Sequence, residues 1–434
     1  MQHDDLNSQD ENRVIPMAKK NHLRIIIVTL VFTMVVTMGS NSFRGIHEPP
    51  TIKEVDLSPK SSQTPHAPIE IDGNAQLETF CVENGSDGLS WETAFQITNL
   101  SLGWGDASGI YIRNTERFLI LSHLQVVGFQ HEIPNWTSDE NKWEKGIKIQ
   151  NCSNVKILNC TMDFNGCGIH INTSTNITVA ENYFTDNFFG IFLMSSHNTT
   201  ISNNYLYDHH RVAIISRESN YNQFISNYLD LESGDGVALY TSNYNQFINC
   251  TADRPSAVDV WNAADYGISL FRSSYNQFIN CSINRSMGNG IELLISSYNQ
   301  FINCSVIKNM DDGFDLWGNS NYNLIENCVI SNSTIGVNIE ISLENTIRRN
   351  LIANNSISGI LVGYYEYQPY YKNQYISNNT FVDNAEDLRY AEWPLEPDDQ
   401  PITDFSGLNF LMGLCGFGLV LYLIARINTR KMRK

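Results

Sequence analysis

The phrase YNQFINC occupies residues 244–250, and the same seven letters recur at 275–281 and 298–304. Close variants are YNQFISN at 221–227 and YNLIENC at 322–328. Aligned on the last letter of the phrase, the chain carries a column of cysteine or asparagine whose members mostly lie 22–24 residues apart. A period of this length is typical of a solenoid built from stacked repeats. The column consists of Cys160, Asn182, Asn204, Asn227, Cys250, Cys281, Cys304, Cys328, Asn350 and Asn379.

Each repeat contains two stretches that alternate in the way strands do. A hydrophobic residue precedes each column member by three positions, as Phe247 precedes Cys250, and a glycine with alternating apolar residues follows, as in GFDL at 313–316. Such alternation predicts short strands. Because short strands without a covering helix cannot bury their inner face alone, the copies must stack. We therefore expect an all-β protein, a right-handed parallel β-helix solenoid of about eleven coils, each of 22–24 residues.

The cysteines of the column invite a metal-site interpretation. Thiols in consecutive coils could hold a soft ion such as Cu(I). However, asparagine takes the same position in other coils, which a functional thiol column would not tolerate. A buried cysteine behaves as a small hydrophobe, and a stacked asparagine can bond its neighbours along the stack. The sequence therefore favours a structural, inward-facing column.

Residues 97–387 resemble the right-handed β-helix repeat proteins, through the coil pattern just described. That group includes NosD-like copper-site-assembly proteins and pectate-lyase-like carbohydrate enzymes. The resemblance implies the fold, and it suggests either carbohydrate binding or copper binding as a function.

The two ends of the chain carry apolar segments with basic flanks, as transmembrane helices do. The first segment could equally be the core of a signal peptide. We expect a cell-membrane protein with its β-helix outside the cell and its C-terminal tail in the cytoplasm, and the net charge of −18 argues against nucleic-acid binding. The expected parts are a cytoplasmic tail (1–22), a transmembrane helix or signal anchor (23–39), a linker rich in Pro, Ser and Thr (40–66), an N-terminal cap (67–116), the β-helix (117–387), a juxtamembrane linker (388–404), a transmembrane helix (405–425) and a basic cytoplasmic tail (426–434).

Charged residues gather at one predicted corner of the middle coils. Four positions after the column come Arg254, Arg285 and Lys308, and acidic or amide residues surround the corner glycines of the same coils. We expect this face to bind a polysaccharide or a surface glycoprotein. A salt-bridge ladder without a ligand is the alternative. The predicted binding residues are Arg254, Asp265, Asn289, Glu292 and Trp261.

The segment NMDDGFDLWG at 309–318 resembles the calcium-binding turn of the pectate lyases. The resemblance implies Asp311, Asp312 and Asp315 as ligands of Ca²⁺, with Lys308 or Arg285 standing in as the catalytic base of a polysaccharide lyase. The sequence departs from that family in two ways, because Asn289 replaces an aspartate and no lysine stands at the position of the usual base.

Copper is the less favoured cofactor. Adjacent residues of an extended loop point apart, so His209 and His210 are not expected to bind one ion together. Either histidine with an outward partner would be the first place to test for copper.

Overall fold

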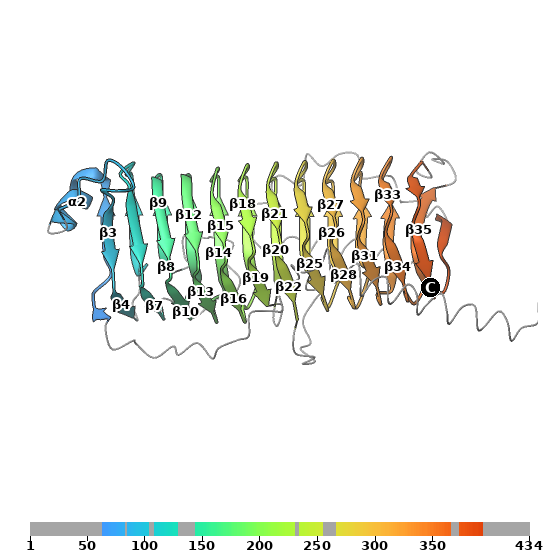
Figure 1. Cartoon of the computed structure of the whole chain (residues 1–434), viewed down its shortest axis with the longest axis horizontal. Coiled ribbons are helices and arrows are strands. Elements are labelled where there is room, and N and C mark those ends of the chain that lie inside the picture. The colour runs from blue at the N-terminus through green and yellow to red at the C-terminus, as the bar shows by residue number, and fades with distance from the viewer. Residues whose placement is uncertain are drawn as a thin grey trace, which may run out of the picture. The chain divides into compact units, whose positions relative to one another are not determined.

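Three parallel sheets run along the molecule, and each coil adds one strand to each sheet (Figure 1). A computed structural model of the chain describes residues 63–82, 85–103, 108–128, 144–230, 234–254, 266–365 and 373–393, all of them in one compact unit that begins at Glu54. Within these residues the sheets contain 13, 13 and 12 strands, and every strand pairs with strands of the neighbouring coils. The predicted parallel β-helix is confirmed.

The three sheets are named A, B and C. Sheet A contains β1 (Thr64–Pro65), β4 (Leu100–Gly103), β7 (Gln125–Val127), β10 (Thr161–Asp163), β13 (Tyr183–Thr185), β16 (Tyr205–Tyr207), β19 (Tyr228–Asp230), β22 (Thr251–Asp253), β25 (Ser282–Asn284), β28 (Ser305–Ile307), β31 (Val329–Ser331), β34 (Leu351–Ala353) and β37 (Thr380–Val382). Sheet B contains β2 (Ile69–Asp72), β5 (Ile110–Arg113), β8 (Lys145–Gln150), β11 (Cys167–Asn172), β14 (Phe189–Met194), β17 (Val212–Arg217), β20 (Asp235–Tyr240), β23 (Ile268–Phe271), β26 (Ile291–Leu294), β29 (Phe314–Trp317), β32 (Ile335–Glu340), β35 (Ser358–Tyr365) and β38 (Leu388–Trp393). Sheet C contains β3 (Phe95–Thr98), β6 (Leu119–Ser122), β9 (Ser153–Leu158), β12 (Thr175–Ala180), β15 (Thr200–Ser202), β18 (Gln223–Ile225), β21 (Gln246–Ile248), β24 (Gln277–Ile279), β27 (Gln300–Ile302), β30 (Leu324–Glu326), β33 (Thr346–Arg348) and β36 (Tyr375–Ser377).

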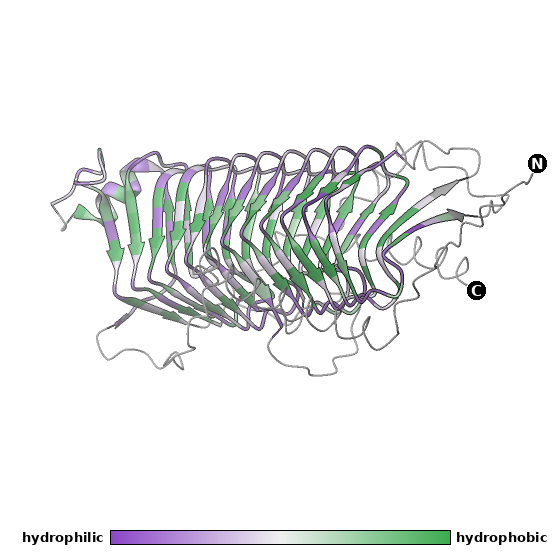
Figure 2. Cartoon of the chain, turned by 45° about the vertical axis from the view of Figure 1, so that its right-hand side comes forward, coloured by the Kyte–Doolittle hydropathy of each residue, from purple (hydrophilic) through white to green (hydrophobic). Residues whose placement is uncertain are grey.

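The inner faces of the sheets enclose one continuous apolar core, and Figure 2 shows hydrophobic residues alternating along the strands. Phe247, Phe278 and Phe301 come from the repeated phrase and are fully buried. Their rings stack at 4.7 and 4.8 Å between centroids. Stacking identical residues in register therefore converts the sequence repeat directly into core packing.

The cysteine and asparagine column faces inward, as predicted. The Asn182 amide donates to the Ile157 carbonyl at 3.0 Å and to Asn204 Oδ1 at 3.0 Å, so asparagines bond along the stack. Cys281 lies 3.5 Å from the Phe247 carbonyl oxygen, and burial raises the pKa of its thiol well above the ordinary value. The eight described cysteines are all buried and free, which matches a structural role.

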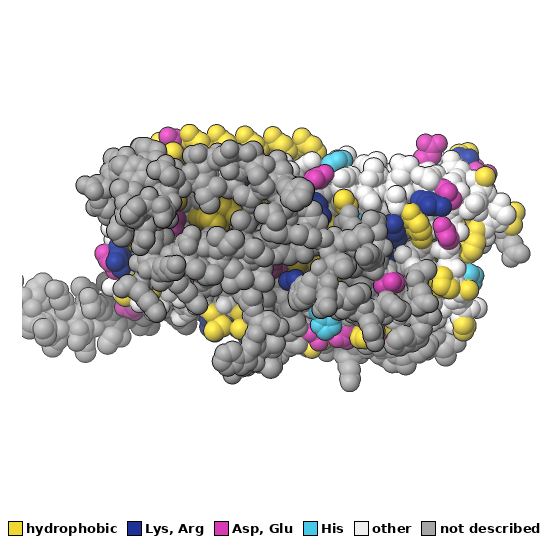
Figure 3. Space-filling view, turned by 180° about the vertical axis from the view of Figure 1, so that it is seen from behind, with side chains coloured by type: hydrophobic (Ala, Val, Ile, Leu, Met, Phe, Trp, Pro, Cys, Tyr) yellow, Lys and Arg dark blue, Asp and Glu magenta, His cyan; other side chains and the backbone are white. Residues whose placement is uncertain are grey.

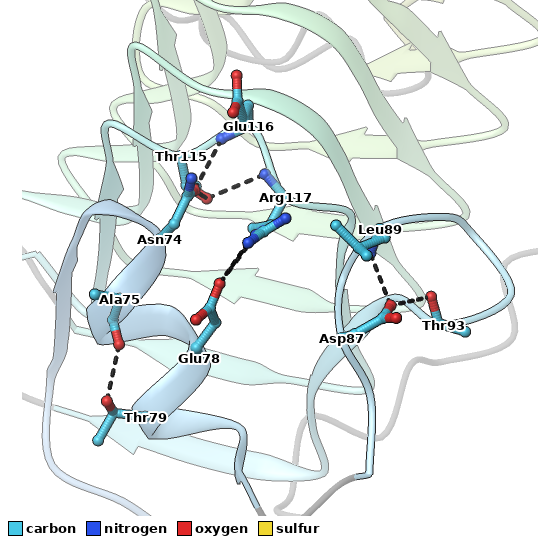
Figure 4. Close-up of polar contacts among 10 residues, drawn as sticks. All are labelled: Asn74, Ala75, Glu78, Thr79, Asp87, Leu89, Thr93, Thr115, Glu116 and Arg117. Carbon is cyan, nitrogen blue, oxygen red and sulfur yellow. Dashed lines mark hydrogen bonds and ion pairs between the residues drawn. The ribbon is translucent and has the colours of Figure 1, made fainter.

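The N-terminal end of the solenoid is closed by helix α2 (Gly73–Phe80), which buries Leu77 in the core. Figure 4 shows how side chains tie this helix to the next coil. Asn74 Oδ1 accepts from Thr115 Oγ1 at 2.7 Å, and the Arg117 guanidinium pairs with Glu78 at 2.7 Å.

The predicted boundaries differ from the observed coils at both ends. The range expected to be a cap, 67–116, already supplies strands to all three sheets, because β2, β3, β4 and β5 lie within it. At the other end β38 continues the solenoid into the range expected to be a linker, 388–404, since Leu388 still packs against the core. Irregular spacing hides these terminal coils from a search based on the repeated phrase.

In the part of the chain that the structure describes, no helix has the length and apolar character needed to cross a membrane. The two predicted membrane segments, 23–39 and 405–425, lie outside the described residues.

Candidate functional site

Six polar side chains gather on the outer face of sheet B, on β26 and the next two strands and in the turns that lead into them. We call these residues the network face. Glu292, Asp315 and Asn338 follow the corner glycines of three successive coils by two positions, and they are neighbours across the paired strands. That position alternates with the inward residues, so the side chains point outward. The network face consists of Asn289, Glu292, Asp312, Asp315, Asn338 and Glu340.

Asn338 lies at the centre of the network. Its Nδ2 donates to Asp312 Oδ2 at 3.1 Å, to Glu340 Oε1 at 3.1 Å and, more weakly, to Asp315 Oδ1 at 3.4 Å. An amide nitrogen carries two hydrogens, so three carboxylates share them. Asn289, in the preceding coil, contacts the same two aspartates. Its Nδ2 donates to Asp315 Oδ2 at 3.1 Å, and its Oδ1 accepts from the Asp312 backbone N–H at 3.0 Å.

Most of the network is buried although it lies on an outer face. Asn338 is only 2% exposed, and Asp312, Asn289 and Glu292 are also buried, while Asp315 and Glu340 are half-buried. Burying carboxylates together is costly, because each loses solvent and repels its neighbours. Stability alone therefore does not account for placing them there.

Asp315 shows the cost most clearly. Loss of solvent around its carboxyl group raises the pKa of Asp315 well above the ordinary value, and the neighbouring charges of Asp312, Glu340 and Glu292 raise it further. This shift favours a protonated Asp315 beside other acidic groups.

The Asn338 side-chain oxygen has an unmet hydrogen-bonding capacity. It is buried and finds no donor among the residues that the structure describes. A buried acceptor without a donor costs about 1–3 kcal/mol. A ligand hydroxyl or amide reaching this position would satisfy it.

The predicted basic column does not join the network as a set. Arg285 forms a two-pronged contact with Asp253 on sheet A, at 2.9 and 2.6 Å. Lys308 is exposed, and Arg254 is buried. Arg285 and Lys308 both have left-handed backbone angles, with φ of 59° and 60°, because they form the turn that leaves sheet A. Asp265 and Trp261 lie outside the described residues.

The donor set does not fit a metal ion as it stands. Among the described residues, no group of three or more His, Cys, Asp or Glu side chains could hold one. Asp312 and Asp315, two of the three predicted calcium ligands, instead accept hydrogen bonds from amides, and Asp312 Oδ1 also accepts from the Ile335 N–H at 3.2 Å. Asp311, the third, lies half-buried at the turn before them.

The histidines considered for copper point in different directions, as expected. His209 is 2% exposed and its Nδ1 lies 3.3 Å from the Asn187 carbonyl, while His210 is exposed. Burial lowers the pKa of His209 to about 3. A second buried histidine, His170 on β11, stacks on Phe192, and burial together with Lys145 and Lys148 lowers its pKa to about 3. Two cationic neighbours make this position unsuitable for a metal cation.

The sequence interpretation missed Asn338 and Glu340. The signal was present, because GVNI at 336–339 repeats the pattern of GFDL at 313–316 one coil later. Counting two residues from each glycine and continuing past Asp315 leads directly to Asn338.

Two family models match the sequence in adjacent ranges. Residues 92–264 match the model described as "Periplasmic copper-binding protein (NosD)", and residues 266–388 match "Right handed beta helix region". The network face falls in the second range, and His209 and His210 fall in the first. A search of curated proteins found no significant match.

Several solved structures are similar to this chain in architecture. A mutant of the periplasmic alginate epimerase AlgG shares 12% identity over 75% of this chain and 86% of that chain, with a TM-score of 0.44. The catalytic domain of a GH87 alpha-1,3-glucanase in complex with tetrasaccharides shares 13% identity over 75% and 67%, with a TM-score of 0.42. The A-module of the Azotobacter vinelandii mannuronan C-5 epimerase AlgE4 shares 11% identity over 74% and 94%, with a TM-score of 0.39. The stacked parallel coils and the family matches together identify this chain as a right-handed parallel β-helix repeat protein.

Proposed function

We propose that this chain is a membrane-anchored extracellular β-helix that binds glycans through the network face. One observation carries the proposal: a largely buried set of carboxylates and amides on an outer face, with the Asn338 oxygen left without a donor among the described residues. Sugar hydroxyls both donate and accept hydrogen bonds, so they can pair with carboxylate oxygens and amide groups at once.

The charge of the network favours a neutral glycan over a uronate polymer. Asp312, Glu292 and Glu340 would repel further carboxylates brought by a ligand. Charge-assisted bonds from sugar hydroxyls to these carboxylates are in turn stronger than bonds between neutral groups.

The experiment is a glycan-array screen with the full-length chain in detergent, followed by calorimetric titration of each glycan that binds. Asp315→Asn and Asn338→Ala should each weaken binding at least tenfold. Asp383→Asn, an acidic-to-amide change at an exposed turn of the last described coil, is the matched control and should bind like the wild type. Equal affinity in all four proteins would reject the network face as the binding site.

Membrane anchoring rests on the two apolar segments with their basic flanks. Anchored protein should remain in the membrane fraction after a high-salt wash and should be released by detergent. A protease added outside intact cells should degrade the β-helix.

A second candidate function is sugar hydrolysis. It is favoured by the raised pKa of Asp315 next to other acidic groups, since two carboxyl groups in opposite protonation states are the usual acid and base of glycoside cleavage. Release of reducing ends from a bound glycan, lost in Asp315→Asn, would support turnover, whereas binding without release would leave the chain a lectin-like protein.

The lyase and copper alternatives have less support. The lyase would need Ca²⁺ on Asp311, Asp312 and Asp315 and a free base, yet Arg285 contacts Asp253 and two of the aspartates accept amide hydrogen bonds. Copper binding is suggested by the NosD family match, with His209 or His210 as the residues to test. A copper titration that is unchanged in His209→Ala and His210→Ala would remove it.

A further inference from the structure

The outward residues of the repeated phrase line one side of the solenoid, on sheet C and in the turn that leads into it, away from the network. Along YNQFINC the second, fourth and seventh letters are buried in the core, the tyrosine is exposed, and the Gln and Ile side chains are mostly half-buried on the outer side. We call these outward residues the ladder face. It consists of Tyr221, Tyr244, Tyr275, Tyr298 and Tyr322, with Gln223, Gln246, Gln277 and Gln300 and with Ile225, Ile248, Ile279 and Ile302.

The tyrosines stand in one exposed row. Their ring centroids follow each other at 5.1, 5.0, 4.9 and 4.9 Å, with ring planes within 8° of parallel. Each is 44–59% exposed. Figure 3 shows a regular line of hydrophobic side chains along the upper edge of the molecule, as this row requires.

The glutamines form a second row beside the first. Gln246 Nε2 donates to Gln277 Oε1 at 3.1 Å, and Gln277 Nε2 donates to Gln300 Oε1 at 3.4 Å. Each of these amides uses one of its two hydrogens in the row, so the other can reach a ligand. The ladder face thus offers the same polar groups once in every coil.

Four of the five coils of the ladder face are uncharged, in a chain whose net charge is −18. The segments 219–227, 242–250, 273–281 and 296–304 contain no acidic or basic residue. At the C-terminal end of the row, the charge of Glu344 raises the pKa of Tyr322, and Glu326 pairs with Arg348 and Arg349. A cationic or an anionic partner would therefore find no complementary charge along the first four coils. The tyrosine ring faces are covered by their neighbours, so the hydroxyl groups and the electropositive ring edges are what a ligand would meet, and both attract oxygen atoms.

The size of this face argues against a second copy of the chain as the partner. Four coil intervals of about 4.8 Å and a width of five residues, from the tyrosine to the isoleucine, give roughly 20 by 17 Å, or on the order of 300 Å². A stable protein interface buries about 800 Å² on each partner. A narrow, straight ligand fits the proportions better.

We propose that the ladder face binds a neutral, extended linear polysaccharide that lies parallel to the solenoid axis. Such a polymer repeats one sugar at a time along a straight line, as the rows of tyrosine and glutamine repeat one coil at a time. Its hydroxyl oxygens accept from the glutamine amides and the tyrosine hydroxyls. The site is separate from the network face and does not depend on it.

The test is affinity electrophoresis of the full-length chain in non-denaturing detergent gels. The gels contain hydroxyethyl cellulose, mixed-linkage β-glucan, galactomannan or, as an anionic polymer, polygalacturonate. At least one neutral polymer should retard the wild type, and polygalacturonate should not. The variant Tyr275→Ser/Tyr298→Ser should bind at least tenfold more weakly. Tyr390→Ser removes an exposed tyrosine from β38 instead and should bind like the wild type.

Three results would overturn the proposal: no retardation by any neutral polymer, equal retardation of the ladder variant and the wild type, or a dimer in light scattering that disappears in the ladder variant. Circular dichroism of the variants confirms that they are folded. Calorimetric titration of Tyr275→Ser/Tyr298→Ser with a glycan whose binding Asp315→Asn weakens should give the wild-type affinity, which separates this site from the network face.

Discussion

The network face and the ladder face lie on the same solenoid, yet their stacked side chains differ in charge and in burial. The ladder face repeats one uncharged set of residues in successive coils and leaves its tyrosines exposed. The residues of the network face differ from coil to coil, and they place acidic groups beside one another with little exposure to solvent. Stacking in register brings like groups together, and this is favourable for aromatic rings and unfavourable for carboxylates.

This difference helps to separate structural from functional residues. Stacked tyrosines and hydrogen-bonded glutamines stabilise the ladder face even without a ligand. The network face lowers stability, as the raised pKa of Asp315 indicates. We infer that the network is retained for binding, and that the ladder can serve stability and binding together.

The largest expected effect lies beneath the ladder face. Phe278→Ala removes the central ring of the stack formed with Phe247 and Phe301, so the free energy of unfolding should fall by about 3–5 kcal/mol. Chemical denaturation measures the loss. A loss below about 1 kcal/mol would mean that the core rings do not support this face.

The next effect compares one chemical group on the two faces. Asn338→Ala removes an amide that bonds three carboxylates, so the free energy of unfolding should fall by about 1–3 kcal/mol. Gln277→Ala removes an amide from the ladder face and should cost only about 0.5 kcal/mol, because water replaces its bonds. Equal losses in parallel denaturation curves would show that the two faces do not differ in burial.

A smaller effect concerns the tyrosine row. Tyr298→Ala interrupts the stack between Tyr275 and Tyr322, and we expect a loss of about 0.5–1.5 kcal/mol. Tyr390→Ala, also an exposed tyrosine, should cost less because it is not part of the row. If thermal unfolding shows the same loss for both, stacking adds nothing to the stability of this face.

The last expected effect concerns how stability depends on pH. The carboxyl group of Asp315 keeps its proton to a higher pH in the folded state than in the unfolded state. It therefore lowers the stability of the fold progressively as the pH rises above about 4, the ordinary pKa of an aspartate. Asp315→Asn cannot ionise, so the amount by which its melting temperature exceeds that of the wild type should grow as the pH rises above about 4 and should level off above the folded-state pKa of Asp315. A difference that does not change with pH would contradict the raised pKa.

Much of the fold could be predicted because inward residues repeat in a strict register. Phe247, Cys250 and their equivalents are buried as the alternation predicts. The ends could not be located, since β2 to β5 lack the repeated phrase. The network face was predicted in part: Asn289, Glu292, Asp312 and Asp315 follow from counting residues, but their partners do not, because pairing depends on how side chains reach between coils. Arg285 illustrates this, as it turns to Asp253 on sheet A instead of joining the acidic group.

A crystal structure of the full-length chain, soaked with an oligosaccharide found on the array and with Ca²⁺, would test the central claim most directly. We predict a sugar hydroxyl within hydrogen-bonding distance of Asn338 Oδ1, with further contacts to Asp315 and Glu292. A calcium ion bridging Asp311, Asp312 and Asp315, or a network that holds no sugar while the oligosaccharide binds elsewhere, would contradict the account.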